Sequence, residues 1–363
     1  MKLRLFTVAI TAAVLLCVLL AVLVAPAGSE LLVKDPVSNF VGRASFYEPV
    51  KYKNLTIIPV QAPEHKIKTA ILTLDEALSK DKLTIKEVDR DGSVNELAVW
   101  NNSDKFVFIM AGEILAGSKQ DRILKKDVLL PPDSGKVIVS VFCVEHGRWT
   151  YKSDTFYSEE KAANISVRNV AQASKDQSAV WRDVAETNAS VGAVAPTGSL
   201  SKATESEKVQ KEKSEYIKEF VDIPSHYPKA NGVVVLVNNK VLVADMFSDT
   251  HIFHKLWPKL NESYVLEAIS RKEREVDSRI SSAEEFLKLI QQADVQYNDY
   301  EGSGKSVEIN SKYVTGTGVV KDSSPIHLGV FPKIEIKEKP VDIPPIYRNY
   351  NDMQQRQTNE PPQ

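Results

Sequence analysis

The chain has 363 residues, of which 43% are hydrophobic and 26% charged. This composition is typical of a folded globular protein, and the length is enough for one large domain or two smaller ones. The formal net charge is −2, which excludes a strongly basic surface. Nucleic acid is therefore not an expected partner.

An export signal is predicted at the N-terminus. Lys2 and Arg4 precede an apolar run from Leu5 to Val24, and small residues follow at 25–27. This order is typical of a secretory signal peptide that is removed after Ala27. The apolar run of about 20 residues is also long enough to span a bilayer, so an uncleaved N-terminal anchor is the alternative. In both cases we expect an exported protein, periplasmic or secreted, that contacts a membrane only through residues 1–27 if they are retained.

Cleavage after residue 27 would leave Cys143 as the one cysteine of the chain, so no intramolecular disulfide is expected. A lone cysteine in an apolar, β-rich run is usually a small buried hydrophobic residue. The alternative is a nucleophile beside His146.

The first part of the chain is dominated by predicted strands. Residues 54–60 are rich in β-branched side chains and predict the first strand. Thr73 is placed to cap a short helix, with Glu76 at the capping-box position. Asp91-Gly92 is a hairpin signal. Residues 54–146 predict roughly eight strands with one short helix, which favours a mostly antiparallel sheet or sandwich over repeated βαβ units.

Later residues predict packed helices and further strands. Apolar residues at helical spacing predict four helices, at 168–188, 205–221, 248–269 and 283–293. Pro258 should kink or split the third of them. Strands are predicted at 233–237, 241–244, 307–309, 313–320 and 326–331. Because these late strands have no other obvious core to join, we expect one sheet built from both halves of the chain.

The predicted fold class is α+β, with a largely antiparallel or mixed β-sheet core and about four packed helices. One domain is expected over residues 40–335. Residues 338–363 are polar and proline-rich and predict a disordered tail.

Several segments resemble one domain family. They are NLTIIPV (54–60), FIMAGEILAGSKQDRIL (108–124), VFCVEHGRW (141–149) and GVVKDSSPIHLGVF (318–331). The family is the ARPP-1 domain, named for its association with ADP-ribosylglycohydrolases and rhodanese-phosphatases, and the resemblance covers residues 54–331. It implies an α+β domain that is often exported in bacteria and has no established reaction. Some members have a neighbourhood of nucleotide or ADP-ribose chemistry.

Two polar clusters within the apolar β region are candidate ligand-binding sites. The first comprises Glu113, Gln120, Asp121 and Arg122. An arginine can hold a carboxylate or phosphate with two hydrogen bonds, and carboxylates can bind hydroxyls or a cation. The alternative is an arginine–carboxylate network that ties strands together, since buried charges must be paired.

The second cluster lies where a predicted strand ends in a glycine turn and comprises Glu145, His146 and Arg148. His146 could act as a general base or a metal ligand, with Glu145 as an acid or second ligand. The alternative is that these side chains make turn hydrogen bonds while Trp149 packs. If the two clusters meet across neighbouring strands, they form a composite site.

Other motifs are weaker. His251 and His254 stand one helical turn apart but have no acidic third ligand nearby in sequence. His327 is expected to be a hydrogen-bonded core histidine. Residues 302–306 (GSGKS) lack the preceding glycine and strand of a phosphate-binding loop. The sequence therefore assigns no metal site, no cofactor and no catalytic residue.

Two functions remain open from the sequence. One is a binding or accessory module for a small polar ligand or a protein partner. The other is a hydrolase for nucleotide-like (ADP-ribose-type) or glycosidic substrates, in which Glu113, Asp121, Glu145 and His146 supply acid–base or metal-binding groups.

Overall fold

Three β-sheets organise the residues that the computed structural model describes, which are 35–65, 70–89, 93, 95–173, 176–193, 195–272 and 278–333. The described residues from Pro36 onward belong to one compact unit. The predicted export signal (1–27) and tail (338–363) lie outside the described residues.

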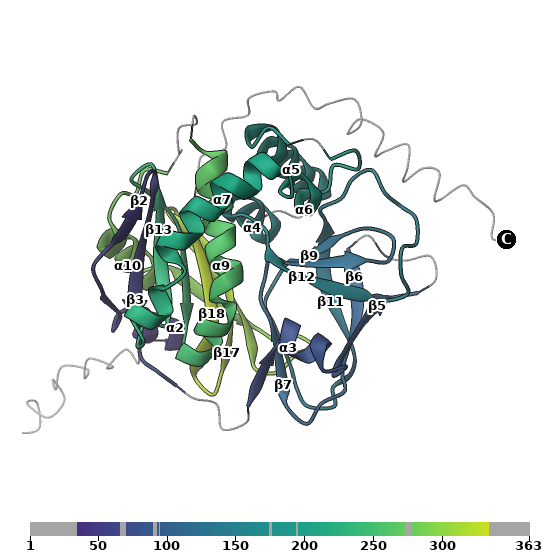
Figure 1. Ribbon diagram of the computed structural model, residues 1–363. Coiled ribbons are helices and arrows are strands. Elements are labelled where there is room, and N and C mark those ends of the chain that lie inside the picture. Colours follow the sequence, from purple (N-terminus) through teal and green to yellow (C-terminus); the bar gives the residue numbers. More distant parts are fainter. Residues whose placement is uncertain are drawn as a thin grey trace, which may run out of the picture. The chain divides into compact units, whose positions relative to one another are not determined.

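The largest sheet has nine strands and joins the start of the described chain to its end (Figure 1). Eight strands follow in the order β1 (Ser45–Phe46), β3 (Leu55–Gln61), β13 (Gly232–Val237), β14 (Lys240–Phe247), β18 (Ser324–Pro332), β17 (Val314–Lys321), β16 (Lys305–Asn310) and β15 (Asp294–Asn298). The ninth, β2 (Val50–Tyr52), also pairs with β3. The neighbouring strands of this sheet are antiparallel.

The strands between β3 and β13 form two further sheets. The six-stranded sheet has the order β12 (Phe156–Ala162), β8 (Glu113–Gly117), β9 (Arg122–Leu124), β11 (Gly135–Cys143), β6 (Glu96–Asn101) and β5 (Leu83–Glu87). The three-stranded sheet consists of β10 (Val128–Leu130), β7 (Phe106–Ile109) and β4 (Ile71–Thr73), with β4 parallel to β7. The expected single sheet is thus only partly right, because β3 joins the late strands but β4–β12 pair among themselves.

Helices pack on these sheets and confirm the predicted α+β class with antiparallel and mixed strands. They are α2 (Pro36–Val41), α3 (Leu74–Ser79), α4 (Ile165–Ala173), α5 (Gln177–Ser190), α6 (Leu200–Ala203), α7 (Glu207–Phe220), α8 (Ile223–His226), α9 (Thr250–Ser270) and α10 (Ala283–Gln291). The capping box predicted at Thr73 and Glu76 is present at the start of α3.

Two helix predictions need correction. The single helix expected at 168–188 is two helices, α4 and α5, because Asp176 caps a new helix by accepting a hydrogen bond from the Ser178 amide at 2.9 Å. The helix expected to be kinked or split at Pro258 runs unbroken as α9 over 21 residues. Its side chains are mostly buried, and this packing outweighs the roughly 3 kcal/mol that an internal proline costs.

Strand β13 explains how the large sheet is buried on both faces. Its residues Val233, Val235 and Val237 share a core cluster with Phe253 and Leu260 of α9. The alternate residues Val234 and Leu236 belong to a second cluster with apolar residues of α2 and α10. Successive strand side chains point to opposite faces, so a continuous apolar run is what a doubly covered strand requires.

A network of four fully buried charged residues connects these elements. Asp245 of β14 accepts hydrogen bonds from both terminal nitrogens of Arg168 of α4, at 3.0 and 2.6 Å. His327 of β18 contacts Asp245 through Nε2 at 3.2 Å and Asp127 through Nδ1 at 2.7 Å. The Tyr264 hydroxyl of α9 donates to Asp245 at 2.6 Å. His327 is thus the hydrogen-bonded core histidine that the sequence predicts.

Electrostatics keeps this network charged despite its burial. Burial opposes the cationic form of His327, but the charge of Asp127 and hydrogen bonds from its ring to both carboxylates raise the pKa of His327 to about 9. Burial would raise the pKa of Asp245, yet Arg168 and His327 hold it well below its usual range. Two cations therefore balance two anions, which is the condition under which buried charges are tolerated.

The network predicts a specific dependence of stability on pH. The folded pKa of His327, about 9, lies above the ordinary histidine value of about 6.5. Its contribution is therefore fully present below pH 6.5 and lost as pH rises through 9. We expect the free energy of unfolding, measured with urea at several pH values, to fall over this window in the wild type. In His327→Gln the free energy of unfolding should be lower than in the wild type at pH 6.5. It should also decrease less between pH 6.5 and 9.

The control is His226→Gln, because His226 is exposed. It should keep the wild-type fall. An equally steep fall in His327→Gln would contradict a cationic His327.

Candidate functional site

Strand pairing brings the two predicted clusters together at one end of the six-stranded sheet. Strands β8 and β9 are antiparallel, and β9 pairs with β11 so that Arg122 faces Cys143. Asp121 immediately precedes β9, and the amide of Val144, just after β11, donates to its carbonyl at 3.0 Å. The residues that follow each strand end are therefore neighbours in space.

Asp121, Glu145 and Arg148 form a hydrogen-bonded group with the hydroxyls of Thr197 and Ser199. We term this group the Arg148 clasp. Arg148 Nη2 lies 3.0 Å from Asp121 Oδ1, and Arg148 Nε donates to Glu145 Oε2 at 2.8 Å. The hydroxyl of Ser199 donates to Asp121 Oδ2 at 3.3 Å, and that of Thr197 donates to Glu145 Oε1 at 2.8 Å. All four carboxylate oxygens thus accept hydrogen bonds from the protein.

The two carboxyl groups of the clasp have pKa values shifted in opposite directions. Burial, reinforced by the charge of Glu145, raises the pKa of Asp121. Burial would also raise the pKa of Glu145, but hydrogen bonds from Arg148 and Thr197 outweigh it and lower that pKa. The arginine therefore stabilises Glu145 as an anion more strongly than Asp121.

The remaining residues of the two clusters lie next to the clasp but make other contacts. Arg122 Nη1 donates to Gln120 Oε1 at 3.1 Å, and Gln120 Nε2 donates to the His146 carbonyl at 3.4 Å. The His146 ring packs edge-on against Trp181 of α5 with ring centroids 4.3 Å apart, and burial lowers its pKa.

Glu113 is not part of this cluster. It is buried at the start of β8 and pairs with Lys259 of α9, which also contacts Asp75 of α3. The structure thus brings together six of the seven candidates and separates Glu113. Whether any of them binds a ligand stays a prediction.

Cys143 and the other histidines offer no metal or nucleophile site in the described ranges. Cys143 is fully buried, and burial raises the pKa of its thiol to about 11. It is therefore protonated at neutral pH, as expected of a small core residue. No group of three or more His, Cys, Asp or Glu residues that could hold a metal is found in the described part of the chain.

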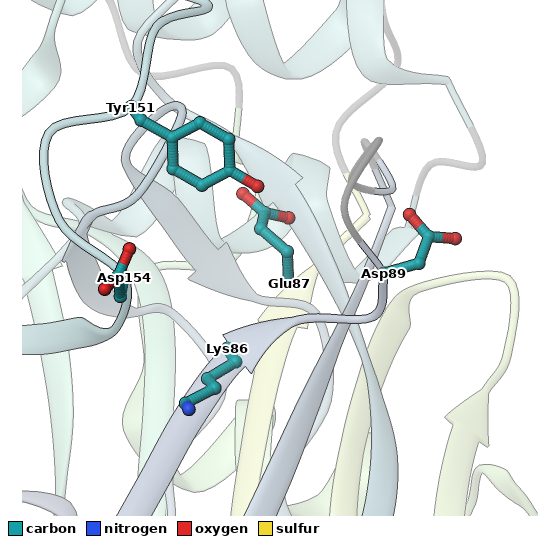
Figure 2. A pocket seen from close by; sticks show the side chains of 5 residues that line it. All are labelled: Lys86, Glu87, Asp89, Tyr151 and Asp154. Atoms are coloured by element: carbon teal, nitrogen blue, oxygen red, sulfur yellow. The ribbon is translucent and has the colours of Figure 1, made fainter. Parts of the chain in front are cut away.

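A pocket of about 380 Å³ lies beside the clasp and was not predicted from the sequence. Its lining residues are Lys86, Glu87, Asp89, Tyr151 and Asp154 (Figure 2). Glu87 ends β5, where Leu83 and Ile85 are buried at the two preceding alternate positions. The period of two placed Glu87 on the inward face, which is the signal that could have identified it.

Ser118 connects the pocket to the clasp. Its hydroxyl donates to Glu87 Oε1 at 2.9 Å, and its carbonyl accepts from Arg148 Nη1 at 2.7 Å and from the Lys152 amide at 2.9 Å. Arg148 Nη1 also donates to the Thr150 carbonyl at 3.2 Å. The clasp therefore fixes the segment that carries Tyr151 and Asp154 against the end of β8.

Removing the guanidinium should loosen this segment. Arg148→Met leaves two nearly buried carboxylates without their cation, and breaking a buried pair costs about 3–5 kcal/mol. We expect a loss toward the lower end of that range in urea unfolding, since Arg148 is slightly exposed. Hydrogen exchange at the Lys152 amide should also become faster.

The matched control is Lys126→Met, which breaks a surface pair with Glu308 whose side chains are 37% and 44% exposed. Such a pair contributes at most about 1 kcal/mol. Equal losses in the two variants would show that the clasp does not stabilise the fold more than an ordinary surface pair.

Comparison with known proteins gives one match. Searches of curated proteins and of solved structures returned no match for this chain. The family model of the ARG and Rhodanese-Phosphatase-superfamily-associated Protein domain, ARPP-1, matches residues 43–331. That range contains the clasp, the pocket and most of the three sheets. It confirms the resemblance noted in the sequence, and the chain belongs to the ARPP-1 domain family.

Proposed function

We propose that this domain is a binding module for a small polar ligand that enters the pocket at Glu87. The strongest support is the state of the Glu87 carboxylate. The Glu87 side chain is 4% exposed, and its Oε2 has no hydrogen-bond partner among the described residues. Buried polar atoms are normally hydrogen-bonded, so a ligand that donates to Oε2 would complete the site.

The surroundings of Glu87 suit binding. Its Oε1 is already held by Ser118, which fixes the direction of the carboxylate. In Figure 2 the Tyr151 hydroxyl and the Glu87 carboxylate point toward each other, with Asp89 and Asp154 on either side. A pocket of about 380 Å³ lies within the range of small-molecule sites, about 300–1,000 Å³.

An accessory role fits the family description. The domain is named for its association with ARG and rhodanese-phosphatase superfamily proteins. We propose that it works beside an enzyme by holding a ligand.

A hydrolase acting on nucleotide-like or glycosidic substrates is the second candidate. The opposite pKa shifts of Asp121 and Glu145 favour it, because an acid and a base need such a difference. We rank it second because every oxygen of the two carboxylates already accepts a protein hydrogen bond.

Export is also proposed, on the strength of the N-terminal sequence. Lys2 and Arg4, the apolar run and the small residues at 25–27 have the order of a signal peptide. No helix within the described residues is long and apolar enough to cross a membrane.

Fractionation of cells that produce the full chain, with N-terminal sequencing of the product, tests the export proposal. We expect the product outside the cytoplasm with an N-terminus at Gly28. A product that remains in the cytoplasm with an intact N-terminus would contradict export, and an exported product with an intact N-terminus would identify an anchor.

Ligand binding is tested by ligand-observed NMR with a panel of neutral, cationic and anionic polar metabolites. At least one should bind the wild type, and Glu87→Gln should weaken that binding about tenfold or more, since a hydrogen bond to a charged group contributes about 1.5–3 kcal/mol. Glu96→Gln makes the same change at an exposed residue of β6 and should leave binding intact. Binding that survives Glu87→Gln, or a panel without any binder, would contradict the proposal.

A further inference from the structure

The charges around Glu87 narrow the class of ligand, and this step rests on the proposed function. Arg122 is fully buried beside Glu87, with Nη2 3.9 Å from Glu87 Oε1. Its Nε and Nη2 have no hydrogen-bond partner in the described part of the chain. A donor and an acceptor without described hydrogen-bond partners therefore lie next to each other at Glu87, which lines the pocket.

A second cation lies against Tyr151, a residue of the pocket wall. The ammonium group of Lys119 is 5.1 Å from the ring centroid of Tyr151 and 5.2 Å from that of Trp149. Its side chain is buried to nine-tenths, so its charge is held in place beside the wall. One of the two faces on which the Tyr151 ring could bind a cation is thus already used by the protein.

Among the described residues, positive and negative groups balance at this pocket and next to it. Glu87, Asp89 and Asp154 supply three carboxylates. Lys86 lines the pocket as well, and Lys119 and Arg122 lie next to its residues. A cationic ligand would be repelled by Arg122 and Lys119, and an anionic ligand by Glu87 and the two aspartates. The arrangement favours a neutral ligand with many hydrogen-bonding groups.

Tyr151 supplies the apolar part of the site. It is 55% exposed although it belongs to the pocket wall. An aromatic ring of this kind offers area for carbon–hydrogen groups and a hydroxyl at one end. A sugar ring suits both Glu87 and Tyr151, because its hydroxyls can donate to carboxylates and its carbon–hydrogen face can pack on an aromatic ring.

We infer that the pocket binds a neutral sugar ring, with one hydroxyl donating to Glu87 Oε2, neighbouring hydroxyls bonding to Asp89 or Asp154, and the ring against Tyr151. Glu87 then contributes a carboxylate acceptor, and Arg122 beside it contributes a donor. A hydroxyl group is the simplest ligand group that can satisfy both, because it donates one hydrogen bond and accepts others.

The test compares three sugars that differ in charge: D-glucose, D-glucosamine and D-glucuronate. Amide chemical shifts of the full chain are followed by NMR at constant pH and ionic strength. We expect the dissociation constant of glucose to be at least about tenfold lower than those of the charged sugars, with shifts at residues 86–89 and 151–154. A tenfold change corresponds to about 1.4 kcal/mol, which is modest for a charge placed beside a like charge in a pocket.

Two variants identify the site. Glu87→Gln should weaken glucose binding about tenfold or more. Tyr151→Ala should do the same, and it keeps the test valid if Glu87→Gln does not fold, because Tyr151 is largely exposed. Glu96→Gln is the control and should bind as the wild type does. Cellobiose, compared with glucose, shows whether the site takes a free sugar or the end of a glycan chain.

Each outcome decides between the two proposals. If a charged sugar binds as tightly as glucose or more tightly, and Glu87→Gln abolishes it, the neutral class is wrong while the ligand site stands. The same follows if glucose does not bind but another member of the polar panel does. If no compound from either set binds, both proposals fail.

Discussion

The chain of charges from Asp127 through His327 and Asp245 to Arg168 is the interaction on which the arrangement of the sheets depends. Asp245 and His327 belong to the nine-stranded sheet, whereas Asp127 immediately precedes β10 of the three-stranded sheet and Arg168 lies on α4. Apolar packing tolerates small shifts, but buried ions tolerate very little displacement from their partners. The network therefore sets the position of the three-stranded sheet and of α4 against the large sheet.

Hydrogen-bond satisfaction distinguishes three kinds of polar group in this domain. The buried network has its charges balanced, and the Arg148 clasp has its four carboxylate oxygens occupied. Glu87 alone among the buried carboxylates discussed here retains an acceptor without a described hydrogen-bond partner, and it lies at the edge of a pocket. The Arg148 clasp is therefore a structural element, and the proposed ligand site is at Glu87 beside it.

The strand and helix pattern was largely predictable because burial imposes a period of two on β5 and about 3.6 on α10. The sequence indicated that the two polar clusters, at 120–122 and 145–148, would meet only if their strands were neighbours. Strands β9 and β11 do pair. The pocket could not be foreseen, because its residues come from two segments more than 60 positions apart. Glu113 was misleading because its partner, Lys259, lies on a distant helix.

Three residues of helix α9 make polar contacts that hold the domain together. Lys259 reaches Glu113 and Asp75, Tyr264 reaches Asp245, and Glu267 accepts hydrogen bonds from Asn164, Ser166 and Arg271. Inserting or deleting one residue would rotate everything beyond it by about 100°, which would separate some of these partners. The length of α9 between Lys259 and Glu267 should therefore be invariant among relatives, even where surface loops differ in length.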